Sequence, residues 1–258
     1  MNILEQIISE RRADVLRRSV RVSLETLREM AAGRKRRSLI ASLQRADVTC
    51  VIAEMKKASP SAGLLTEKYI PSEIARNYEK AGASAISVLT EPKHFMGSDD
   101  HLRRVRDAVN LPILRKDFIC DVYQVYETAA FGADVMLLIV AALDRSELVD
   151  LYHEAVECGL EVLVEAHTVS EVETAVSLDG AIVGVNSRDL KTLRTDLSVA
   201  RSLIKEIPSG RIAVAESGIK TREDIVELKT LGYRGFLVGE ALMREGNPHG
   251  VLERLVSG

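Results

Sequence analysis

Short apolar runs alternate along this chain with longer segments of mixed polarity. The runs begin near residues 50, 84, 112, 135, 161, 181, 211 and 235. They are nearly uninterrupted, which is typical of strands in a parallel sheet whose two faces are both covered. Each intervening segment is long enough for a helix. The pattern therefore predicts eight strand–helix units in succession.

The intervening segments also carry the sequence signals of helix ends. Four of them open with capping-box spacing or a close relative of it, namely Ser170 with Glu173, Thr221 with Asp224, Asp144 with Glu147, and Asp121 with Gln124. Several close on a glycine that suits a left-handed C-cap, at Gly82, Gly132, Gly159 and Gly232. Eight such units predict an α/β protein with a closed (β/α)8 TIM barrel. A doubly wound open sheet is the alternative, and it lacks support because no G-x-G-x-x-G follows the first run.

Residues 1–44 precede the first apolar run and have a helical pattern. The apolar residues Ile3, Leu4, Ile7, Ile8, Val15 and Leu16 are spaced for one buried stripe. The segment also carries ten basic residues. A nucleic-acid-binding arm would explain them, but acidic residues are interleaved, so we interpret the segment as a solvated helix face. We expect residues 1–258 to form a single barrel domain with residues 1–44 as an N-terminal helical extension.

Composition narrows the classes of partner. The chain is 46% apolar and 28% charged, with a formal net charge of −3, so we expect neither nucleic acid nor a membrane as partner. Cys50, Cys120 and Cys158 are odd in number and form no C-x-x-C pair, which argues against disulfides and a zinc site. No apolar stretch reaches the ~18 residues of a membrane span, and the N-terminus lacks the apolar core of a signal peptide. We therefore expect a cytoplasmic protein.

Charged or amide side chains stand where five of the apolar runs end. They are Glu54, Lys56, Lys116, Glu165, Asn186 and Glu216. The carboxyl ends of barrel strands form the active-site mouth, and residues two apart on a strand share a face. Charged strand ends can simply meet solvent, but five inward-facing positions favour a catalytic site. In such a site, lysines donate protons or bind anions, and a glutamate serves as general base.

Glycine-containing turns follow the seventh and eighth runs, where barrels often bind phosphate through backbone N–H groups. The turns contain Ser217 with Gly218, and Gly239 with Glu240. Either glycine alone would suit an ordinary βα turn, but together they favour a phosphate site, with Lys56 as its cation. The loop over residues 57–63 is long and rich in small residues. It is either a mobile lid that carries a phosphate ligand or a flexible connection.

A series of motifs resembles, in order, those of the indole-3-glycerol phosphate synthase family. They are EMKKASPS at 54–61, SVLT at 87–90, FMGS at 95–98, LRKDF at 114–118, DVYQV at 121–125, GVNSRDL at 184–190 and AESGI at 215–219. The resemblance runs from the N-terminal helix to GEALM at 239–243. It implies a (β/α)8 barrel with an N-terminal helical extension. It also implies a carboxy-lyase of tryptophan biosynthesis that uses no cofactor.

The reaction implied by this resemblance converts 1-(2-carboxyphenylamino)-1-deoxyribulose 5-phosphate into indole-3-glycerol phosphate, with loss of CO₂ and water. The substrate is thus a small sugar phosphate that bears an anthranilate ring. Lys116 would be the general acid for the carbonyl oxygen, and Glu165 the base for the anilino proton. The acid for the departing hydroxyl would be Lys116 or Lys56.

The resemblance implies the remaining roles as well. Glu54 and Glu216 would hold the lysines and hydroxyls, and Asn186 would hydrogen-bond the substrate hydroxyls. The residues implied to bind the aromatic part of the substrate are Ser59, Phe95, Phe118, Leu137 and Leu190. Ordinary core packing explains the aromatic members equally well. Glu240 stands where some relatives have serine, which leaves its backbone N–H for the phosphate.

Two other kinds of function fit parts of the pattern. A class I aldolase would use Lys116 as a Schiff-base nucleophile. A non-catalytic binding barrel would keep the fold and the phosphate turns, although the intact Lys116–Glu165 pair argues against it. His167 shares strand parity with Glu165, yet we interpret it as a solvated loop histidine. The sequence is compatible with a monomer and with a homodimer.

Overall fold

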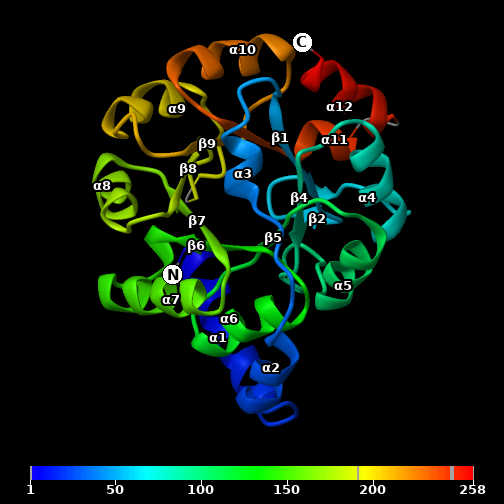
Figure 1. The fold of residues 1–258 in the computed structure, drawn as a ribbon, viewed down its shortest axis with the longest axis vertical. Coiled ribbons are helices and arrows are strands. Elements are labelled where there is room, and N and C mark those ends of the chain that lie inside the picture. Colours follow the sequence, from blue (N-terminus) through cyan, green and yellow to red (C-terminus); the bar gives the residue numbers. More distant parts are fainter. Residues whose placement is uncertain (1, 191, 245–246, 258) are drawn as a thin grey trace.

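Eight parallel strands close into a barrel in the computed structural model, which describes residues 2–190, 192–244 and 247–257 (Figure 1). The strands are β1 (Cys50–Met55), β4 (Ala85–Leu89), β5 (Ile113–Lys116), β6 (Val135–Ile139), β7 (Glu161–Ala166), β8 (Ile182–Asn186), β9 (Ala213–Glu216) and β10 (Gly235–Val238). They are arranged in chain order, and β1 closes the ring by pairing with both β4 and β10. Each strand begins within two residues of its predicted start. The (β/α)8 TIM barrel is confirmed.

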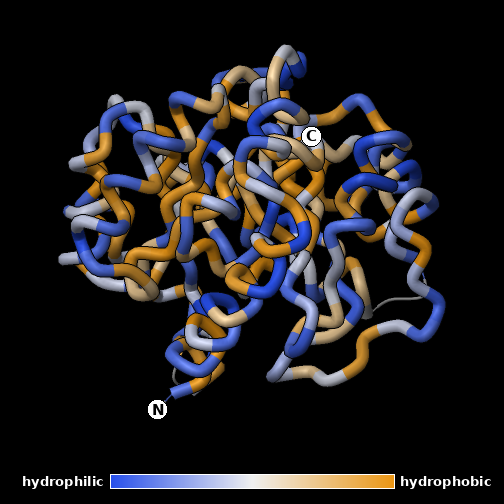
Figure 2. The backbone as a smooth tube through the Cα atoms, turned by 90° about the horizontal axis from the view of Figure 1, so that it is seen from below, coloured by the Kyte–Doolittle hydropathy of each residue, from blue (hydrophilic) through white to orange (hydrophobic). Residues whose placement is uncertain are grey.

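Helices surround the strands as an outer layer. They are α4 (Pro71–Lys80), α5 (Asp99–Ala108), α6 (Val122–Ala130), α7 (Arg145–Glu157), α8 (Val169–Ser177), α9 (Ser198–Leu203), α10 (Arg222–Leu231), α11 (Glu240–Arg244) and α12 (Pro248–Val256). In Figure 2 these helices alternate between hydrophobic and hydrophilic stretches along the tube. This alternation is the pattern of a helix with one face on the core and the other in water. Short 3-10 helices at Val140–Ala142 and Ile204–Glu206 complete the layer.

Three of the four predicted helix starts are confirmed, and one is wrong. Capping boxes are present at Asp144 with Glu147 and at Thr221 with Asp224, and Asp121 caps α6. Helix α8, however, begins before Ser170, because the Thr168 hydroxyl already accepts the N–H of Glu171. β7 ends at Ala166, so this earlier cap leaves only a tight turn between strand and helix. The turn contains His167.

The N-terminal extension reaches one end of the barrel through its third helix. The extension contains α1 (Ile3–Ser19), α2 (Leu24–Ala31) and α3 (Leu39–Leu43). Leu39 and Leu43 join the apolar cluster inside the barrel, together with Cys50 and Ile52 of β1. Leu43 packs so closely on β10 that a Cβ at Gly235 would lie 2.3 Å from it. Helix α3 therefore plugs the amino-terminal end of the strands.

Helix α1 buries one stripe, as predicted, but the stripe is not purely apolar. Its buried members are Leu4, Ile7, Arg11 and Val15. Leu16, which we expected to be buried, is 69% exposed. Arg11 is buried because it reaches an acidic partner on the barrel, so the interpretation of the basic residues as a solvated face is wrong for this residue. Arg36 also contacts the barrel, donating to the carbonyl oxygens of Ala129 and Ala133.

The core has two parts that the barrel wall separates. One apolar cluster fills the barrel interior, and a larger one lies between strands and helices. Leu137 belongs to the interior cluster, against which Phe118 and Leu190 pack. Among the described residues, none of the helices combines the length and apolar character that crossing a bilayer requires.

A small antiparallel hairpin follows β1 at the carboxyl end of the strands. It pairs β2 (Ala58–Ser59) with β3 (Gly63–Leu64), within the loop whose role the sequence leaves open. Ser61, at the tip of this hairpin, accepts a hydrogen bond from Arg188. The first loop is therefore connected to the loop that follows β8.

Candidate active site

Four strands each bring one polar side chain to the mouth of the barrel. Lys116 ends β5, Glu165 lies near the end of β7, Asn186 ends β8 and Glu216 ends β9. Glu165 is the centre of this group. It accepts hydrogen bonds from Lys116 Nζ at 2.9 Å and from Asn186 Nδ2 at 3.0 Å. Lys116 Nζ also lies 3.5 Å from Glu216 Oε2, so the residues predicted as acid, base and amide meet at one place.

A second lysine–carboxylate pair lies on the opposite side of the mouth, on and after β1. Lys56 Nζ is 2.5 Å from Glu54 Oε1. Both side chains face inward, as their two-residue spacing predicts. Each lysine of the mouth therefore has its own carboxylate, and Glu216 is the additional acid.

Glycines on neighbouring strands make room for two of these carboxylates. A Cβ at Gly184 of β8 would lie 2.3 Å from Glu216 Oε1, and one at Gly239 would lie 2.3 Å from Glu54 Oε1. Real Cβ atoms do not approach an oxygen so closely, so any side chain at either position would displace the carboxylate. The glycines thus fix the direction in which Glu54 and Glu216 point.

Two carboxyl groups of the mouth, those of Glu165 and Glu216, differ strongly in pKa. Burial alone would raise the pKa of Glu165, but Lys116, His167 and the Asn186 amide stabilise the carboxylate and lower its pKa to about 2. Burial raises the pKa of Glu216 to about 8; Lys116 opposes this shift, while Glu165 and Glu54 add to it. The difference follows the geometry, since Lys116 hydrogen-bonds Glu165 and lies farther from Glu216. Glu165 therefore favours its ionised form, whereas Glu216 favours its protonated form much more than an ordinary glutamate does.

The two lysine–carboxylate pairs hold their charges strongly. Burial would lower the pKa of Lys116, yet the surrounding carboxylates raise it well above its ordinary range. Likewise, burial would raise the pKa of Glu54, but Lys56 and Lys116 lower it. Neither oxygen of Glu216 has a hydrogen-bond partner among the described residues. These oxygens can therefore form hydrogen bonds to a group that binds beside them.

A cavity of about 500 Å³ opens beside these residues. Its lining includes all the residues predicted to bind phosphate, which are Lys56, Ser217, Gly218, Gly239 and Glu240. Ser217 and Gly218 both have positive φ, at 64° and 84°. The sharp turn after β9 therefore exposes the backbone of this loop to the cavity. Lys116, Glu54 and Glu216 also line it.

A smaller apolar pocket of about 90 Å³ adjoins this cavity. It is lined by four of the five residues predicted to bind the aromatic part of the substrate, namely Ser59, Phe95, Phe118 and Leu190. The rings of Phe95 and Phe118 are 6.0 Å apart. Leu137 does not line this pocket; it is 1% exposed and lies in the interior cluster on which Phe118 packs. Ile3, Leu4 and Ile7 complete the pocket wall, so α1 is part of the site.

Arg188 is the main residue of the site that sequence reasoning left without a role. It lines both the larger cavity and the apolar pocket. Its guanidinium donates to Ser61 Oγ at 3.1 Å and to Glu240 Oε2 at 2.9 Å. The Arg188 guanidinium therefore connects the loops that follow β1, β8 and β10. The signal was present in the sequence, since Arg188 follows Asn186 by two residues.

His167 is not the solvated loop histidine that we expected. Its side chain is 12% exposed and lies between Glu165 and Glu171. The expectation is wrong because α8 begins directly after it, and the tight turn holds the ring against the barrel.

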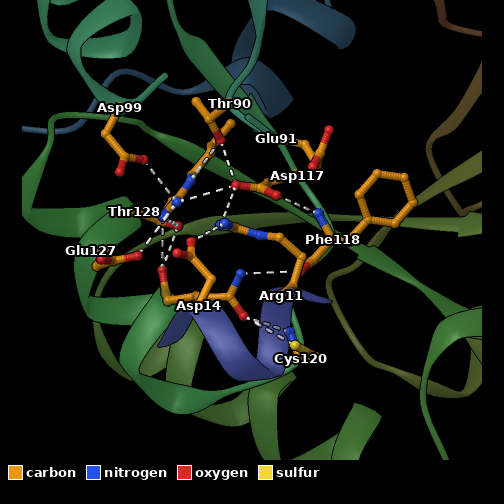
Figure 3. Close-up of polar contacts among 12 residues, drawn as sticks. Arg11, Asp14, Thr90, Glu91, Asp99, Asp117, Phe118, Cys120, Glu127 and Thr128 are labelled. Carbon is orange, nitrogen blue, oxygen red and sulfur yellow. Dashed lines mark hydrogen bonds and ion pairs between the residues drawn. The ribbon is translucent and has the colours of Figure 1, made fainter. Parts of the chain in front are cut away.

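Lys116 has two charged neighbours in sequence whose side chains point the other way. Arg115 and Asp117 face the helix layer, where they form a buried ionic network (Figure 3). Asp117 Oδ2 accepts hydrogen bonds from Arg11 at 2.8 Å, Arg115 at 3.2 Å and Thr90 at 2.6 Å. This network ties α1 to the strand that carries Lys116. The sequence offers LRKDF as a motif but does not reveal Arg11 as its distant partner.

The outer network includes further acidic groups around Arg115. Its guanidinium lies 3.0 Å from Asp99 and 3.4 Å from Glu127. Arg18 of α1 pairs with the same two carboxylates. We define the outer network as Arg11, Arg18, Arg115, Asp99, Asp117, Glu127 and their hydroxyl partners Thr90 and Thr128.

With this geometry established, the chain can be compared with known proteins. The family model described as indole-3-glycerol phosphate synthase matches residues 4–255. This chain belongs to the indole-3-glycerol phosphate synthase family. Indole-3-glycerol phosphate synthases are carboxy-lyases of tryptophan biosynthesis that act on a small phosphorylated substrate. The match includes α1 and α3 as well as the barrel, so the N-terminal extension is part of the family pattern.

More distant structures share the fold with this synthase family member. A thiamine phosphate pyrophosphorylase from Pyrococcus furiosus matches with a TM-score of 0.57 at 15% identity, over 80% of this chain and 93% of that chain. A cube-shaped, highly porous protein cage designed by fusing symmetric oligomeric domains matches with a TM-score of 0.56 at 15% identity, over 80% of this chain and 70% of that chain. At this identity the likeness shows the barrel fold alone.

Proposed function

We propose that this chain closes the indole ring of 1-(2-carboxyphenylamino)-1-deoxyribulose 5-phosphate, releasing CO₂ and water to give indole-3-glycerol phosphate. The observation that carries the proposal is the hydrogen-bonded group of Lys116, Glu165 and Asn186 at the barrel mouth, where Lys116 lines the cavity of about 500 Å³. Lys56, Ser61 and Arg188 line both this cavity and the apolar pocket. One molecule with a phosphate at one end and an aromatic ring at the other would span them.

The chemistry requires an acid twice and a base once. In ring closure, the ring carbon that bears the carboxylate bonds to the ketone carbon, and the ketone oxygen takes a proton. Breaking the C–CO₂ bond then returns an electron pair to the ring and restores its aromaticity. In dehydration, the hydroxyl leaves with a second proton, and a base removes one from the new ring. With an ionised substrate carboxylate, each turnover therefore consumes one proton.

Lys116 suits the role of the acid in ring closure, and Glu165 suits that of the base. Their contact of 2.9 Å lets a proton taken by Glu165 return to Lys116. A general acid or base of this kind contributes about 10²–10⁴-fold to the rate. The acid for dehydration is Lys116 or Lys56, since both line the larger cavity.

The other predicted residues suit binding and orientation. Lys56 would pair with the phosphate, and the turns at Ser217–Gly218 and Gly239–Glu240 would supply backbone N–H groups. The Glu240 side chain is engaged by Arg188, which agrees with a backbone role for this residue. The aromatic ring would lie against Phe95 and Phe118.

The remaining polar groups of the mouth suit the hydroxyl groups of the substrate. Asn186 donates one hydrogen bond to Glu165, and its Oδ1 accepts the Arg188 backbone N–H at 3.0 Å. The second N–H of its amide would donate to a substrate hydroxyl. When protonated, Glu216 can donate a hydrogen bond to substrate, because neither of its oxygens has a hydrogen-bond partner among the described residues. Glu54 would hold Lys56 in place.

The decisive experiment is steady-state formation of indole fluorescence from the proposed substrate. We expect turnover by the natural chain and a loss of about 10²–10⁴-fold in kcat for Lys116→Met. Lys56→Met distinguishes the two roles proposed for Lys56. Loss of a phosphate ligand should raise KM, whereas loss of the acid for dehydration should lower kcat. No turnover by a folded natural chain would refute the proposal. Trapping of Lys116 by borohydride in the presence of substrate would instead favour the aldolase mechanism.

A further inference from the structure

His167 lies in the two-residue turn between β7 and α8. Its backbone N–H donates to Glu171 Oε2 at 2.8 Å, while Thr168 caps the helix. The imidazole Nδ1 lies 3.3 Å from the same Glu171 oxygen, and Nε2 lies 3.4 Å from Glu165 Oε1. The ring is therefore held from one side and directed at the proposed base on the other.

The Nε2 atom is buried and has no hydrogen-bond partner among the described residues. Its 3.4 Å separation from Glu165 is within ion-pair range, and a small rotation of the ring would complete a hydrogen bond. Glu171 fixes Nδ1 as the protonated nitrogen, because a carboxylate oxygen can only accept. Nε2 is then free to bind or release the second proton.

A second cleft, of about 720 Å³, lies on the other side of His167. His167 and Glu171 line it, together with Asn186, Arg188 and residues of the loop after β8. Lys116, Glu54 and Glu216 line the cavity of about 500 Å³ but not this cleft. His167 thus connects the proposed base with a cleft that Lys116 does not line, although Asn186, Arg188 and Leu190 of the substrate site do.

The charges around His167 come from four elements. Glu165 of β7, Glu171 of α8 and Glu216 of β9 are acidic, and Lys116 of β5 lies behind Glu165. Burial would lower the pKa of His167, but the hydrogen bond with Glu171 and the charge of Glu165 outweigh burial and raise it. The ring can therefore carry a proton near neutral pH.

The proposed reaction needs such a carrier. Two protons leave the acid groups and one returns through Glu165, so each turnover leaves the site one proton short. Substrate with its phosphate in the larger cavity would cover the direct path from solvent to Lys116. Protons could then still reach the site from the second cleft, through His167, during turnover.

We propose that His167 is a proton relay that delivers this proton from the second cleft to the Glu165–Lys116 pair. The proposal rests on the synthase function proposed above. In the relay, imidazolium Nε2–H passes its proton to Glu165 Oε1, and after the carboxyl group rotates, Glu165 passes that same proton to the neutral Lys116 amine. The neutral imidazole then takes a proton from water in the second cleft. Each step moves one proton, and the cycle restores the starting charges.

The first test compares the natural chain with His167→Gln and His167→Asn. Glutamine can keep a contact with Glu165 and asparagine one with Glu171, but neither amide carries protons. We expect kcat to fall by about 10²-fold, the lower end of the range for general acid–base catalysis, with little change in KM. The solvent deuterium isotope effect on kcat should rise, and the alkaline limb of the kcat–pH profile that reflects His167 should disappear. His153→Gln, on exposed α7, is the matched control and should change none of these quantities.

The second test is chemical rescue. His167→Ala leaves space for a small base, and the second cleft is large enough to admit imidazole. Added imidazole should restore much of the lost kcat in His167→Ala and should leave the natural chain and Glu165→Gln unchanged. Circular dichroism and thermal unfolding establish that each variant is folded.

The outcomes separate the relay from the synthase function. If Glu165→Gln is inactive while His167→Gln keeps its kcat, pH profile and isotope effect, the relay is refuted and the synthase stands. A lower kcat without rescue, and with an unchanged isotope effect, would also refute the relay and leave His167 as a residue that positions Glu165. If the natural chain forms no indole product, the synthase proposal itself fails.

Discussion

Two groups of buried charges lie on opposite faces of one strand, and they differ in how well they are satisfied. On β5, Arg115 faces outward into the outer network and Lys116 faces inward to the mouth. Arg115 donates to six oxygen atoms, and Asp117 receives hydrogen bonds on both oxygens. Of the charged groups in the outer network, Arg11 alone keeps a buried atom, Nε, without a hydrogen-bond partner among the described residues. At the mouth, both oxygens of Glu216 and Nε2 of His167 have no hydrogen-bond partner among the described residues.

This difference indicates that the outer network stabilises the fold and that the charges at the mouth serve the proposed reaction. A buried charge whose hydrogen bonds are all made stabilises one arrangement of the chain, and removing one partner is costly. A buried polar atom left without a partner is instead available to a ligand. The same alternation of strand side chains thus supplies a stabilising ionic network on one face and the proposed catalytic residues on the other.

The largest expected effect is on stability and tests the outer network. Arg115→Met leaves Asp99, Asp117 and Glu127 without their central cation, so we expect a loss of about 3–5 kcal/mol in the free energy of unfolding. Lys116→Met, one residue along, also removes a cation from Glu165, but Glu165 keeps the Asn186 amide and the nearby His167, so we expect a smaller loss than for Arg115→Met. Urea unfolding of both variants measures the contrast. Equal losses in the free energy of unfolding would show that the charges on both faces of β5 stabilise the fold to the same degree.

A smaller effect on stability is expected at the tether of α1. Arg11→Met removes one of the charged donors to Asp117, which still has Arg115, Thr90 and the Phe118 N–H. Hydrogen bonds to charged groups contribute about 1.5–3 kcal/mol, so we expect a loss in that range. Amide hydrogen exchange should accelerate in α1 more than in the barrel. Because Ile3, Leu4 and Ile7 line the apolar pocket, KM should also rise.

The next effect concerns the direction of one carboxylate at the mouth. Gly184→Ala would place a methyl group 2.3 Å from Glu216 Oε1 and force that side chain to move. We expect a loss of about 10-fold in kcat, which corresponds to about 1.4 kcal/mol of transition-state stabilisation. Gly180→Ala is a control outside the mouth, and it should lower stability through its positive φ without changing kcat in the folded protein. An unchanged kcat in Gly184→Ala would mean that the orientation of Glu216 is unimportant.

The smallest expected effect is a change in how stability depends on pH. Burial raises the pKa of Glu216 from 4.5 to about 8, so between these values the folded chain holds a proton that the unfolded chain releases. The free energy of unfolding therefore falls as pH rises through this window. Glu216→Gln cannot lose a proton, so its stability relative to the natural chain should increase from pH 4.5 toward pH 8 and then level off. We expect a gain above about 1 kcal/mol, since one pKa unit is about 1.4 kcal/mol; a constant difference across this range would contradict the assignment.

The strands and the inward charges were predictable, because each depends on a local pattern. Runs of apolar residues fix the strands, and the two-residue period puts Glu54 and Lys56 on one face. The residues of the apolar pocket were implied by the family resemblance instead; four of the five line it, whereas Leu137 lies deeper, in the interior cluster. Local pattern thus determines the face of a side chain but not its depth.

The rest depends on contacts between distant parts of the chain. Arg11 looks like any solvated arginine on a helix until Asp117 is placed beside it, and nothing in the sequence near Arg11 points to that partner. His167 was misjudged for a related reason. Whether it faces solvent depends on where α8 begins, and the hydroxyls of Thr168 and Ser170 offer two caps that sequence spacing does not distinguish.

The tether of α1 also bears on the order in which the site is assembled during synthesis. Arg11 is synthesised before its partner Asp117, which lies 106 residues farther along the chain. Arg12 is likewise synthesised before Glu147, which lies 135 residues farther along. Helix α1 can dock only after β5 and α7 have left the ribosome. Ile3, Leu4 and Ile7 of α1 therefore join the lining of the apolar pocket late in synthesis, although they are among the first residues made. A nascent chain holding only the first barrel strands would have neither this lining nor the anchor for it.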